Sequence, residues 1–269
     1  MEADTSIAQP ANASTSVPAR VKPVPKRSTF AEYAESLLVT VLLALFGTTF
    51  IVQAFKIPSQ SMEPTLLVGD HLLVNKFIFE GNGAWYERLL PYRAVRRGDI
   101  IVFKFPFDDH PHYVKRVIGL PGDRVRIINQ HVYVNGLPLS EPYVVHDPAY
   151  EDPFGDNFPP INRYFVELGL RPEWAAKILS HVQSGELVVP PDNYFVMGDN
   201  RDRSWDSRYW GFVNRRAVMG RPIVIYWSVE ATSGDYVDRG FFGTFRAIGQ
   251  NLLHLPSRTR WHRMMHEVR

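Results

Sequence analysis

Two serines, Ser59 and Ser61, stand two residues apart in the sequence IPSQSMEPTL, residues 57–66, and Pro58 and Pro64 bracket them. A serine hydroxyl becomes a nucleophile when a neighbouring base removes its proton. Histidine can be that base, and so can a lysine whose charged form is destabilised by burial. Taken alone, the segment favours a simple proline-rich turn, so the candidate base has to be sought elsewhere in the chain.

The sequence HYVKRVIG, residues 112–119, offers a lysine for this role. Alternate side chains of a strand face opposite sides, so Tyr113, Lys115 and Val117 share one face. Lys115 then lies between an aromatic and a branched aliphatic side chain, where desolvation lowers a lysine pKa. The pattern alone still favours a surface lysine on a half-exposed strand, because the adjacent Arg116 fits a wet face on either side.

Other kinds of site have little support. The chain has no cysteine, which excludes disulfides, thiolate catalysis and cysteine-bound zinc. The close histidine pairs, His110 with His112 and His262 with His266, belong to no HExxH motif and are typical of exposed histidines. The Gly-Asn-Gly at 81–83 lacks the third glycine of a dinucleotide loop. We therefore expect neither a metal nor a cofactor, although a Ser-His-Asp triad is not excluded by composition.

The composition is that of a folded protein, with 45% hydrophobic and 22% charged residues in 269. Thirty Lys and Arg against 28 Asp and Glu give a formal net charge of +2. A dedicated nucleic-acid-binding protein normally carries a basic excess on one face. The charge balance therefore predicts no nucleic-acid partner.

One apolar run, SLLVTVLLALFGTTFIVQAF at residues 36–55, contains no charged residue. As a helix it would extend about 30 Å, the thickness of the hydrocarbon core of a bilayer. A buried helix of a soluble protein and a cleavable signal peptide are the alternatives, and Val52-Gln53-Ala54 does resemble a small-x-small cleavage site. Because signal-peptide cores are only about 7–15 residues long, we interpret residues 31–56 as a retained transmembrane anchor.

The charges that flank this run predict its orientation. Four basic residues between positions 20 and 27 precede it, partly offset by Glu32 and Glu35, whereas only Lys56 follows closely. The positive-inside rule then places residues 1–30, a disordered tail by composition, in the cytoplasm. Everything after the span would lie on the outer side of the membrane.

The rest of the chain is predicted to be mainly β. Several short segments are rich in Val, Ile, Tyr and Phe and end at turn-forming residues, which is typical of an antiparallel sheet or barrel. We assign residues 57–245 to this domain. The strand-like segments are residues 99–105, 113–120, 123–128, 131–136, 193–198 and 221–228.

Two segments differ from this pattern. Residues 142–190 form a Pro-rich insertion, within which 171–185 is predicted to form a short helix that begins near Pro172 and ends near Gly185. Residues 246–269 form a basic tail whose apolar residues are spaced loosely like those of a helix. A solvated terminal helix is the simpler interpretation of this tail, and a helix lying on an anionic membrane surface is the alternative.

Four segments of the chain closely resemble the successive motifs of bacterial type I signal peptidases, or leader peptidases, a family of serine-lysine dyad proteases. The segments are residues 57–76, 96–106, 113–123 and 198–213, and they follow the single apolar run in the order and spacing of that family. With their connections they cover roughly residues 30 to 230, and four motifs in order are a specific signal.

The resemblance implies a role for each matching residue. Ser61 occupies the position of the nucleophile and Lys115 that of the general base. Ser59 matches a serine that helps to hold the oxyanion, and Ser204 one that orients the lysine. The residues that resemble the supporting polar network of the family are Asp199, Asp206 and Arg208.

The resemblance also implies the substrate. Members of this family bind an extended peptide by β-addition and accept small residues at the first and third positions before the cut, which gives an Ala-x-Ala preference. The expected partners are preproteins that carry signal peptides and emerge from the export machinery, together with membrane lipid. The expected location is the bacterial cytoplasmic membrane. The residues expected to line the substrate pockets are Phe55, Ile57, Pro58, Met62, Leu66 and Val114.

The chain departs from the family pattern in two respects. It has one apolar span where well-studied Gram-negative members have two, and Arg203 replaces a common asparagine beside Ser204. Two other functions remain open. A specialised or repressor-type Ser-Lys protease would differ in its substrate, and the repressor type would carry a DNA-binding module in place of the span. An inactive membrane-anchored β-domain would be expected to lack Ser61, Lys115 or Ser204.

Overall fold

A computed structural model of the chain describes residues 28–47, 51–79, 92–107, 112–147, 149–150, 152, 154, 157–160, 169–231 and 257–268. The chain divides into two compact units, Met1–Leu43 and Ala44–Arg269. Nearly all of the predicted disordered tail lies outside the described residues, and so do the Gly-Asn-Gly at 81–83 and His110.

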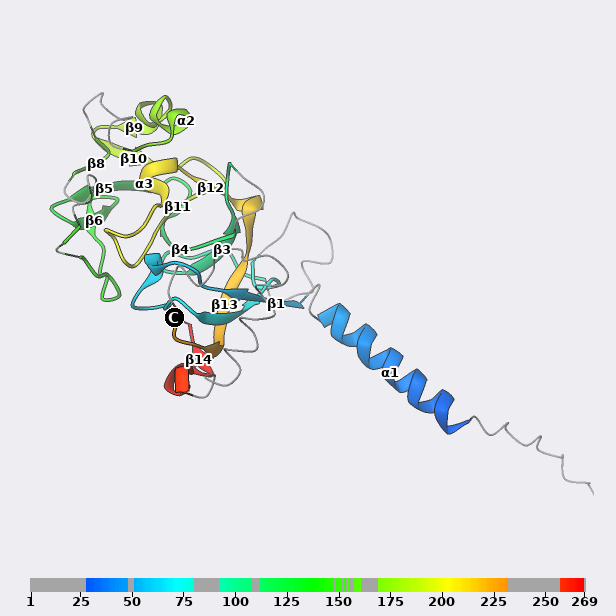
Figure 1. The fold of residues 1–269 in the computed structure, drawn as a ribbon. Helices are drawn as coiled ribbons and strands as arrows, with labels where there is room; N and C mark the ends of the chain where they lie inside the picture. The colour runs from blue at the N-terminus through cyan, green and yellow to red at the C-terminus, as the bar shows by residue number, and fades with distance from the viewer. Residues whose placement is uncertain are drawn as a thin grey trace, which may run out of the picture. The chain divides into compact units, whose positions relative to one another are not determined.

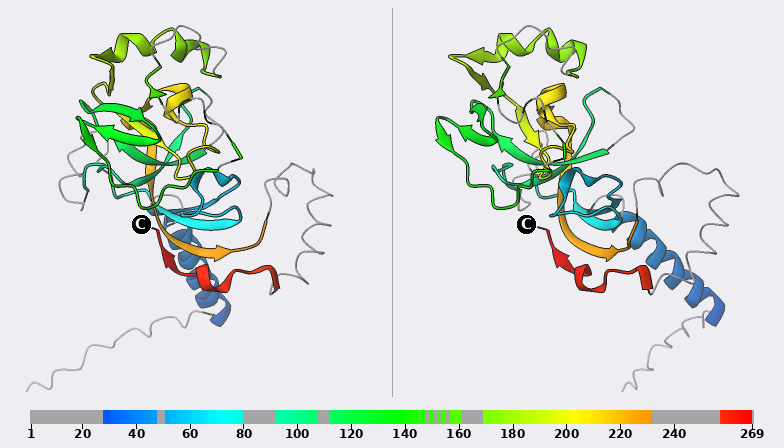
Figure 2. Two further views of the ribbon diagram at one scale, coloured as in Figure 1. Left: turned by 90° about the vertical axis from the view of Figure 1, so that its left-hand side faces the viewer. Right: turned by 60° about the vertical axis from the view of Figure 1, so that its left-hand side comes forward.

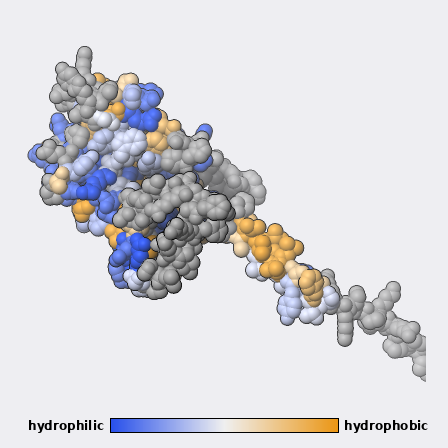
Figure 3. Space-filling view, viewed as in Figure 1, coloured by the Kyte–Doolittle hydropathy of each residue, from blue (hydrophilic) through white to orange (hydrophobic). Residues whose placement is uncertain are grey.

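Helix α1, Thr29–Phe46, is the first element of the chain (Figure 1). Its 18 residues extend about 27 Å, and none of them is buried. Much of its surface is hydrophobic (Figure 3). Within the described part of the chain it is the one helix long and apolar enough to cross a membrane.

The α-helix ends at Phe46, earlier than the predicted anchor of residues 31–56. Residues Val52–Lys56 instead form strand β1, which pairs antiparallel with β2, Asp70–Asn75. The prediction of helix at 52–56 is therefore wrong. It rested on apolar composition alone, and these residues instead pair with β2 at the edge of a sheet.

The domain after α1 is built on two antiparallel sheets, which confirms the predicted mainly-β fold. The larger sheet curls (Figure 1) and has the strand order β1-β2-β13-β3-β4-β11-β12, with β14 paired to β13. Its strands beyond β1 and β2 are β3 (Ile100–Lys104), β4 (His112–Gly119), β11 (Asn193–Met197), β12 (Val213–Asn214), β13 (Val218–Ser228) and β14 (His266–Glu267).

The smaller sheet has the order β7-β6-β5-β10-β9, with β8 paired to β5. Its hairpins use left-handed turn residues, for example Asn135 and Gly136 between β6 and β7. All six predicted strand segments are confirmed in the two sheets. The strands of the smaller sheet are β5 (Arg124–Ile128), β6 (His131–Val134), β7 (Leu137–Pro138), β8 (Asn157–Phe158), β9 (Val182–Gln183) and β10 (Glu186–Val188).

Strand β13 joins the two halves of the larger sheet, because it pairs with both β2 and β3. Its register shifts at several points, one of them between Pro222 and Val224. Proline has no N–H to give to a ladder, so it is tolerated at such an irregularity. These shifts bend the strand, and β2 and β4 are thereby held in the same curled sheet.

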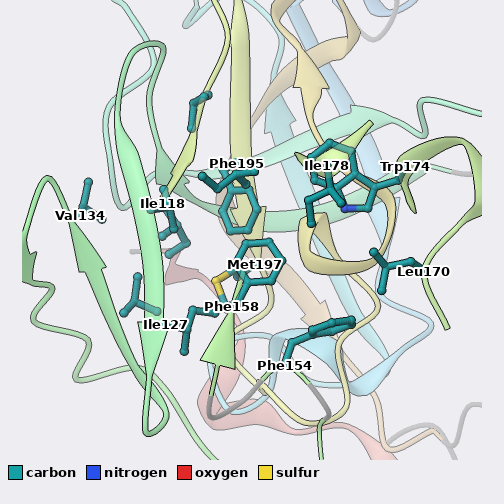
Figure 4. Packing of buried hydrophobic residues seen from close by; sticks show 14 residues of the cluster. Ile118, Ile127, Val134, Phe154, Phe158, Leu170, Trp174, Ile178, Phe195 and Met197 are labelled. Carbon is teal, nitrogen blue, oxygen red and sulfur yellow. The ribbon is translucent and has the colours of Figure 1, made fainter. Parts of the chain in front are cut away.

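The predicted insertion at 142–190 packs into the smaller sheet. Its predicted helix is shorter than expected, with α2 at Pro172–Ala175 and the 3₁₀ helix η4 at Ile178–His181. Strand β10 follows and pairs with β5. Aromatic and aliphatic side chains of this segment meet those of β4, β5 and β11 in one buried cluster (Figure 4), which includes Phe154, Phe158, Trp174, Ile178 and Phe195.

The C-terminal segment belongs to the fold as well. Residues 257–268 contain the 3₁₀ helix η7, Trp261–Arg263, and strand β14, which pairs with β13 (Figure 2). Residues 261–268 therefore form a 3₁₀ turn and a strand in place of the expected terminal helix. The reason is the buried carboxylate of Asp70, which accepts hydrogen bonds from Arg263 Nη2 at 2.7 Å and from Ser228 Oγ at 2.6 Å. Two basic residues of the tail, Arg260 and Arg263, form ion pairs with this carboxylate.

We predict that Arg263→Ala lowers the free energy of unfolding by about 2 to 3 kcal/mol, because it leaves the Asp70 carboxylate buried without its main cation. Arg260, 3.8 Å from the same carboxylate, limits the loss. Urea unfolding in detergent, followed by tryptophan fluorescence, measures the change. The exposed neighbour His262→Ala is the matched control. Equal unfolding midpoints for the two variants would contradict the structural role of Arg263.

Candidate active site

Ser61 lies on a short turn at the start of the domain. The 3₁₀ helix η2, Gln60–Met62, connects β1 to β2, and Ser61 within it is buried. The loop is closed behind the serine by two backbone hydrogen bonds, Ile57 N–H to Asp70 O at 2.9 Å and Gly69 N–H to Ile57 O at 3.0 Å. The backbone that carries Ser61 is therefore fixed on the edge of the sheet.

Lys115 comes from β4 and points at this turn. Its amine nitrogen lies 2.5 Å from Ser61 Oγ, and the side chain is only 2% exposed. Burial is the largest influence on this amine and lowers the pKa of Lys115 to about 8. Asp206 and Asp199 act to raise that pKa, whereas Arg208 acts to lower it. A lysine in this state can accept a proton from the neighbouring hydroxyl near neutral pH.

The expectation of a surface lysine on a half-exposed strand is therefore wrong. Lys115 and Arg116 point to opposite faces of β4, and both are buried. One face of β4 meets the turn of Ser61, and Arg116 on the other meets Asp199. Alternation identified the two faces correctly, but it could not tell that loops cover both.

Two buried carboxylates support the site, and each binds an arginine. Asp199 accepts hydrogen bonds from Arg116 Nε at 2.8 Å and Nη2 at 2.7 Å. Asp206 accepts them from Arg208 Nε at 2.9 Å and Nη2 at 2.8 Å. Burial acts to raise the pKa of Asp206, but the charge and hydrogen bonds of Arg208 outweigh it, so this pKa stays below its usual value. Both carboxylates are thus matched by a guanidinium.

The two other predicted serines have distinct partners. Ser59 Oγ lies 3.3 Å from Ser61 Oγ, and its oxyanion role stays a prediction. Ser204 Oγ donates to Asp206 at 2.7 Å and accepts from the Gly198 N–H at 3.1 Å. Within the described residues no hydrogen bond joins Ser204 to Lys115. The lysine-orienting role of Ser204 therefore stays a prediction.

Most of the apolar residues predicted to line substrate pockets gather beside the turn. Ile57, Met62 and Leu66 are buried in one cluster, against which Phe55 and Val114 are partly buried. The remaining residue, Pro58, is exposed and is not part of this cluster.

Sequence reasoning missed several residues that hold the site together. Thr65 Oγ1 donates to Asp199 at 2.6 Å, and Arg116 stacks over the ring of Tyr143 at 3.8 Å. Arg208 also binds Asp152 of the Pro-rich insertion, and Arg201 binds Glu141, which directly precedes that insertion. The adjacent Lys-Arg pair on β4 was the one available signal, because two neighbouring cations in a strand need partners on both faces.

Comparison with known proteins identifies the family of this chain. Residues 30–227 match the model of the family described as signal peptidase, peptidase S26. The chain belongs to this family. It is accordingly a serine endopeptidase with a membrane-anchor candidate in α1, as the resemblance of its motifs predicted.

Individual signal peptidases are similar over most of the chain. A probable signal peptidase I-2 of Synechocystis sp. is 36% identical over 214 residues, which cover 77% of this chain and 78% of that protein. Signal peptidase I of Pseudomonas aeruginosa is 34% identical over 226 residues, covering 78% and 77%. A crystal structure of a signal peptidase I from Enterococcus faecalis V583 is 33% identical and covers 48% of this chain and 97% of that one, with a TM-score of 0.32.

Gly198 allows the loop that follows β11 to reach the nucleophile turn. A Cβ at this position would lie 2.3 Å from the Ser61 carbonyl oxygen and 2.3 Å from Ser204 Oγ. Neither neighbour is the far end of a flexible side chain, so a larger residue would separate the loop from the turn. Only glycine, which has no Cβ, fits between them.

We predict that Gly198→Ala lowers peptidase activity about 100-fold, because a displacement of about 1 Å in a catalytic group costs that much. Activity on a preprotein, with binding of the same preprotein as a second readout, measures the effect. Gly47→Ala is the matched control, since a Cβ there would meet nothing within 4 Å. Full activity of Gly198→Ala would show that the close approach is dispensable.

Proposed function

We propose that this signal peptidase is a membrane-bound endopeptidase that removes N-terminal signal peptides from exported preproteins after small-x-small sites. Ser61 is the nucleophile and Lys115 the general base. The observation that carries this proposal is the buried amine of Lys115, 2.5 Å from Ser61 Oγ, with its pKa lowered to about 8. The described residues include no group of three or more His, Asp or Glu side chains that could hold a metal ion.

The reaction begins with transfer of the Ser61 hydroxyl proton to the neutral amine of Lys115. The oxygen attacks the scissile carbonyl, and negative charge develops on the carbonyl oxygen. The Ser59 hydroxyl and the Ser61 N–H are the donors for this charge. The protonated amine then gives its proton to the leaving amine, and water hydrolyses the acyl-enzyme with Lys115 again as base.

The substrate binds as an extended strand beside the turn of Ser61. β11 pairs with β4 only through residues 116–119, so the half of β4 that carries Lys115 is not paired with β11. β1 is the end strand of the sheet order. The rings of Phe55 and His112 lie 5.4 Å apart, so β1 approaches β4 there. We assign the small side chains before the cut to the apolar cluster of Ile57, Met62 and Leu66 beside the turn.

The anchor fits this substrate. The signal peptide of a preprotein is itself apolar and lies in the bilayer, and its cleavage site emerges at the outer surface. Helix α1 ends at Phe46, only fifteen residues before Ser61, so the active site stays near that surface. The basic residues that precede α1 favour a cytoplasmic N-terminus and a catalytic domain on the outer side. Membrane lipid is therefore a partner along with the preproteins.

Cleavage of a purified preprotein with an Ala-x-Ala site, in detergent, tests the proposal. We expect a cut directly after the second alanine that chelators do not affect and that mass spectrometry can map. Ser61→Ala and Lys115→Ala should abolish it, and Ser59→Ala should retain a rate lower by about 10²–10³. Activity that survives in Lys115→Ala would refute the base. Failure of the wild type on every preprotein would favour a specialised protease or an inactive relative.

The dyad also predicts the pH dependence. Because only the neutral amine can accept the proton, kcat/KM should rise with pH through the lysine pKa and level off above it. We expect an apparent pKa of about 8, with a tenfold fall per pH unit below it. The measurement is kcat/KM from pH 5.5 to 10, with unfolding followed over the same range as the control. A rate that is constant from pH 6 to 8 would contradict a lysine base.

A further inference from the structure

A polar cavity of about 370 Å³ adjoins the nucleophile turn. It is formed by η2, the segment 145–147 and the loop after β11. None of the apolar residues of the Ile57 cluster lines it. Its polar and charged lining residues are Gln60, Glu63, His146, Asp147, Asn200 and Arg203.

The cavity is lined by residues next to the nucleophile. Gln60 directly precedes Ser61, and the Asn200 N–H donates to the Ser61 carbonyl oxygen at 3.2 Å. The apolar cluster and the cavity meet at the turn of Ser61, because Met62 belongs to the cluster and Gln60 and Glu63 line the cavity. The other walls of the cavity come from the segment 145–147 after β7 and from the loop after β11. A peptide that crosses Ser61 with its first residues against the cluster therefore meets the cavity next.

Asn200 leaves one hydrogen-bonding group unused. Its side chain is 7% exposed, and its Oδ1 atom is buried with no hydrogen-bond donor. Buried oxygens without a donor are rare in folded proteins, because the lost interaction with water is not replaced. A bound chain that carries N–H groups would supply that donor.

Arg203 forms the rim of the cavity. Its Nη1 donates to Gln60 Oε1 at 2.9 Å and its Nε to Asp147 Oδ2 at 2.8 Å. Arg203 thus ties the residue before the nucleophile to the opposite wall of the cavity. The asparagine expected at this position by resemblance is shorter than arginine, so this rim is a feature of the present chain.

We propose that this cavity binds the first residues after the scissile bond, the start of the mature protein. Asn200 Oδ1 accepts a hydrogen bond from an N–H of that segment, and Arg203 keeps the cavity open and in place beside Ser61. The proposal rests on the proposed function, because it takes the Ile57 cluster as the site for residues before the cut. It makes Asn200 and Arg203 determinants of substrate preference.

Two peptide substrates test this assignment. Both carry the same sequence up to an Ala-x-Ala site and the same first residue after the cut, so the leaving amine is identical. One ends there as an amide, and the other continues for four more residues. We expect the wild-type chain to prefer the longer peptide about fivefold to tenfold in kcat/KM, mainly through a lower KM, as one or two hydrogen bonds provide.

Asn200→Ala and Arg203→Ala should each reduce this preference to less than about twofold. The ratio between the two peptides is the readout, since general structural damage would lower both rates alike. Arg203 is about half exposed, so its variant is expected to fold. Arg124→Ala is the matched control, because Arg124 is an exposed arginine paired with Glu186 in the smaller sheet.

A wild-type enzyme that cleaves both peptides equally well would overturn the cavity assignment and leave the proposed function intact. A preference that persists in both variants would overturn it too. Cleavage of neither peptide, when a full preprotein is also left uncut, would overturn the proposed function and this inference with it.

Discussion

The constraint on which the rest of the structure depends is a buried lysine amine that must lose its proton readily although two carboxylates lie near it. Burial destabilises the ammonium form, but Asp199 and Asp206 pull the pKa of Lys115 back upward. Each carboxylate is paired with a guanidinium, Asp199 with Arg116 and Asp206 with Arg208, and the charge of Arg208 acts to lower the pKa of Lys115. Since arginine keeps its charge at any relevant pH, the compensation holds while the lysine titrates. The ion pairs around the dyad are therefore best explained by the proton affinity of the amine, because buried ion pairs add little stability of their own.

The fold supplies this environment from distant parts of the chain. β4 brings Lys115 and Arg116, and the loop after β11 brings Asp199 and Asp206. The start of the Pro-rich insertion and the residue before it bring Asp152 and Glu141, which bind Arg208 and Arg201. The loop after β11 also contacts the nucleophile turn directly, because Gly198 has no side chain to keep them apart. The smaller sheet and the cluster in Figure 4 fix the base of that loop, since β11 contributes Phe195 and Met197 to it. A change in the packing of that cluster would be transmitted to Lys115 along β4, which contributes Ile118 to the cluster.

Sequence reasoning predicted the mainly-β fold, the apolar helix and the strands β3, β4, β5, β6, β11 and β13, because period-2 alternation and an uncharged run are local signals. It could not predict β1 or β14, since a strand at an edge is defined by its partner more than by its composition. The resemblance placed Ser61 and Lys115, which the structure brings to 2.5 Å, whereas alternation alone made the lysine a surface residue. The partners of the buried charges, such as Asp152 and Arg263, were unpredictable. Each is one acidic or basic residue among many, chosen by three-dimensional proximity over long sequence separations.

The nucleophile turn is held from both of its sides, and this explains why a basic C-terminal segment belongs to a catalytic domain. Thr65, four residues after Ser61, donates its hydroxyl to Asp199 and accepts a hydrogen bond on its carbonyl oxygen from Arg263. Asp70, at the start of β2, binds the same arginine and the Leu67 N–H. The turn is thus connected on one side to the carboxylate that influences Lys115 and on the other to the end of the chain. A turn fixed in this way holds the Ser61 hydroxyl within hydrogen-bonding distance of the Lys115 amine.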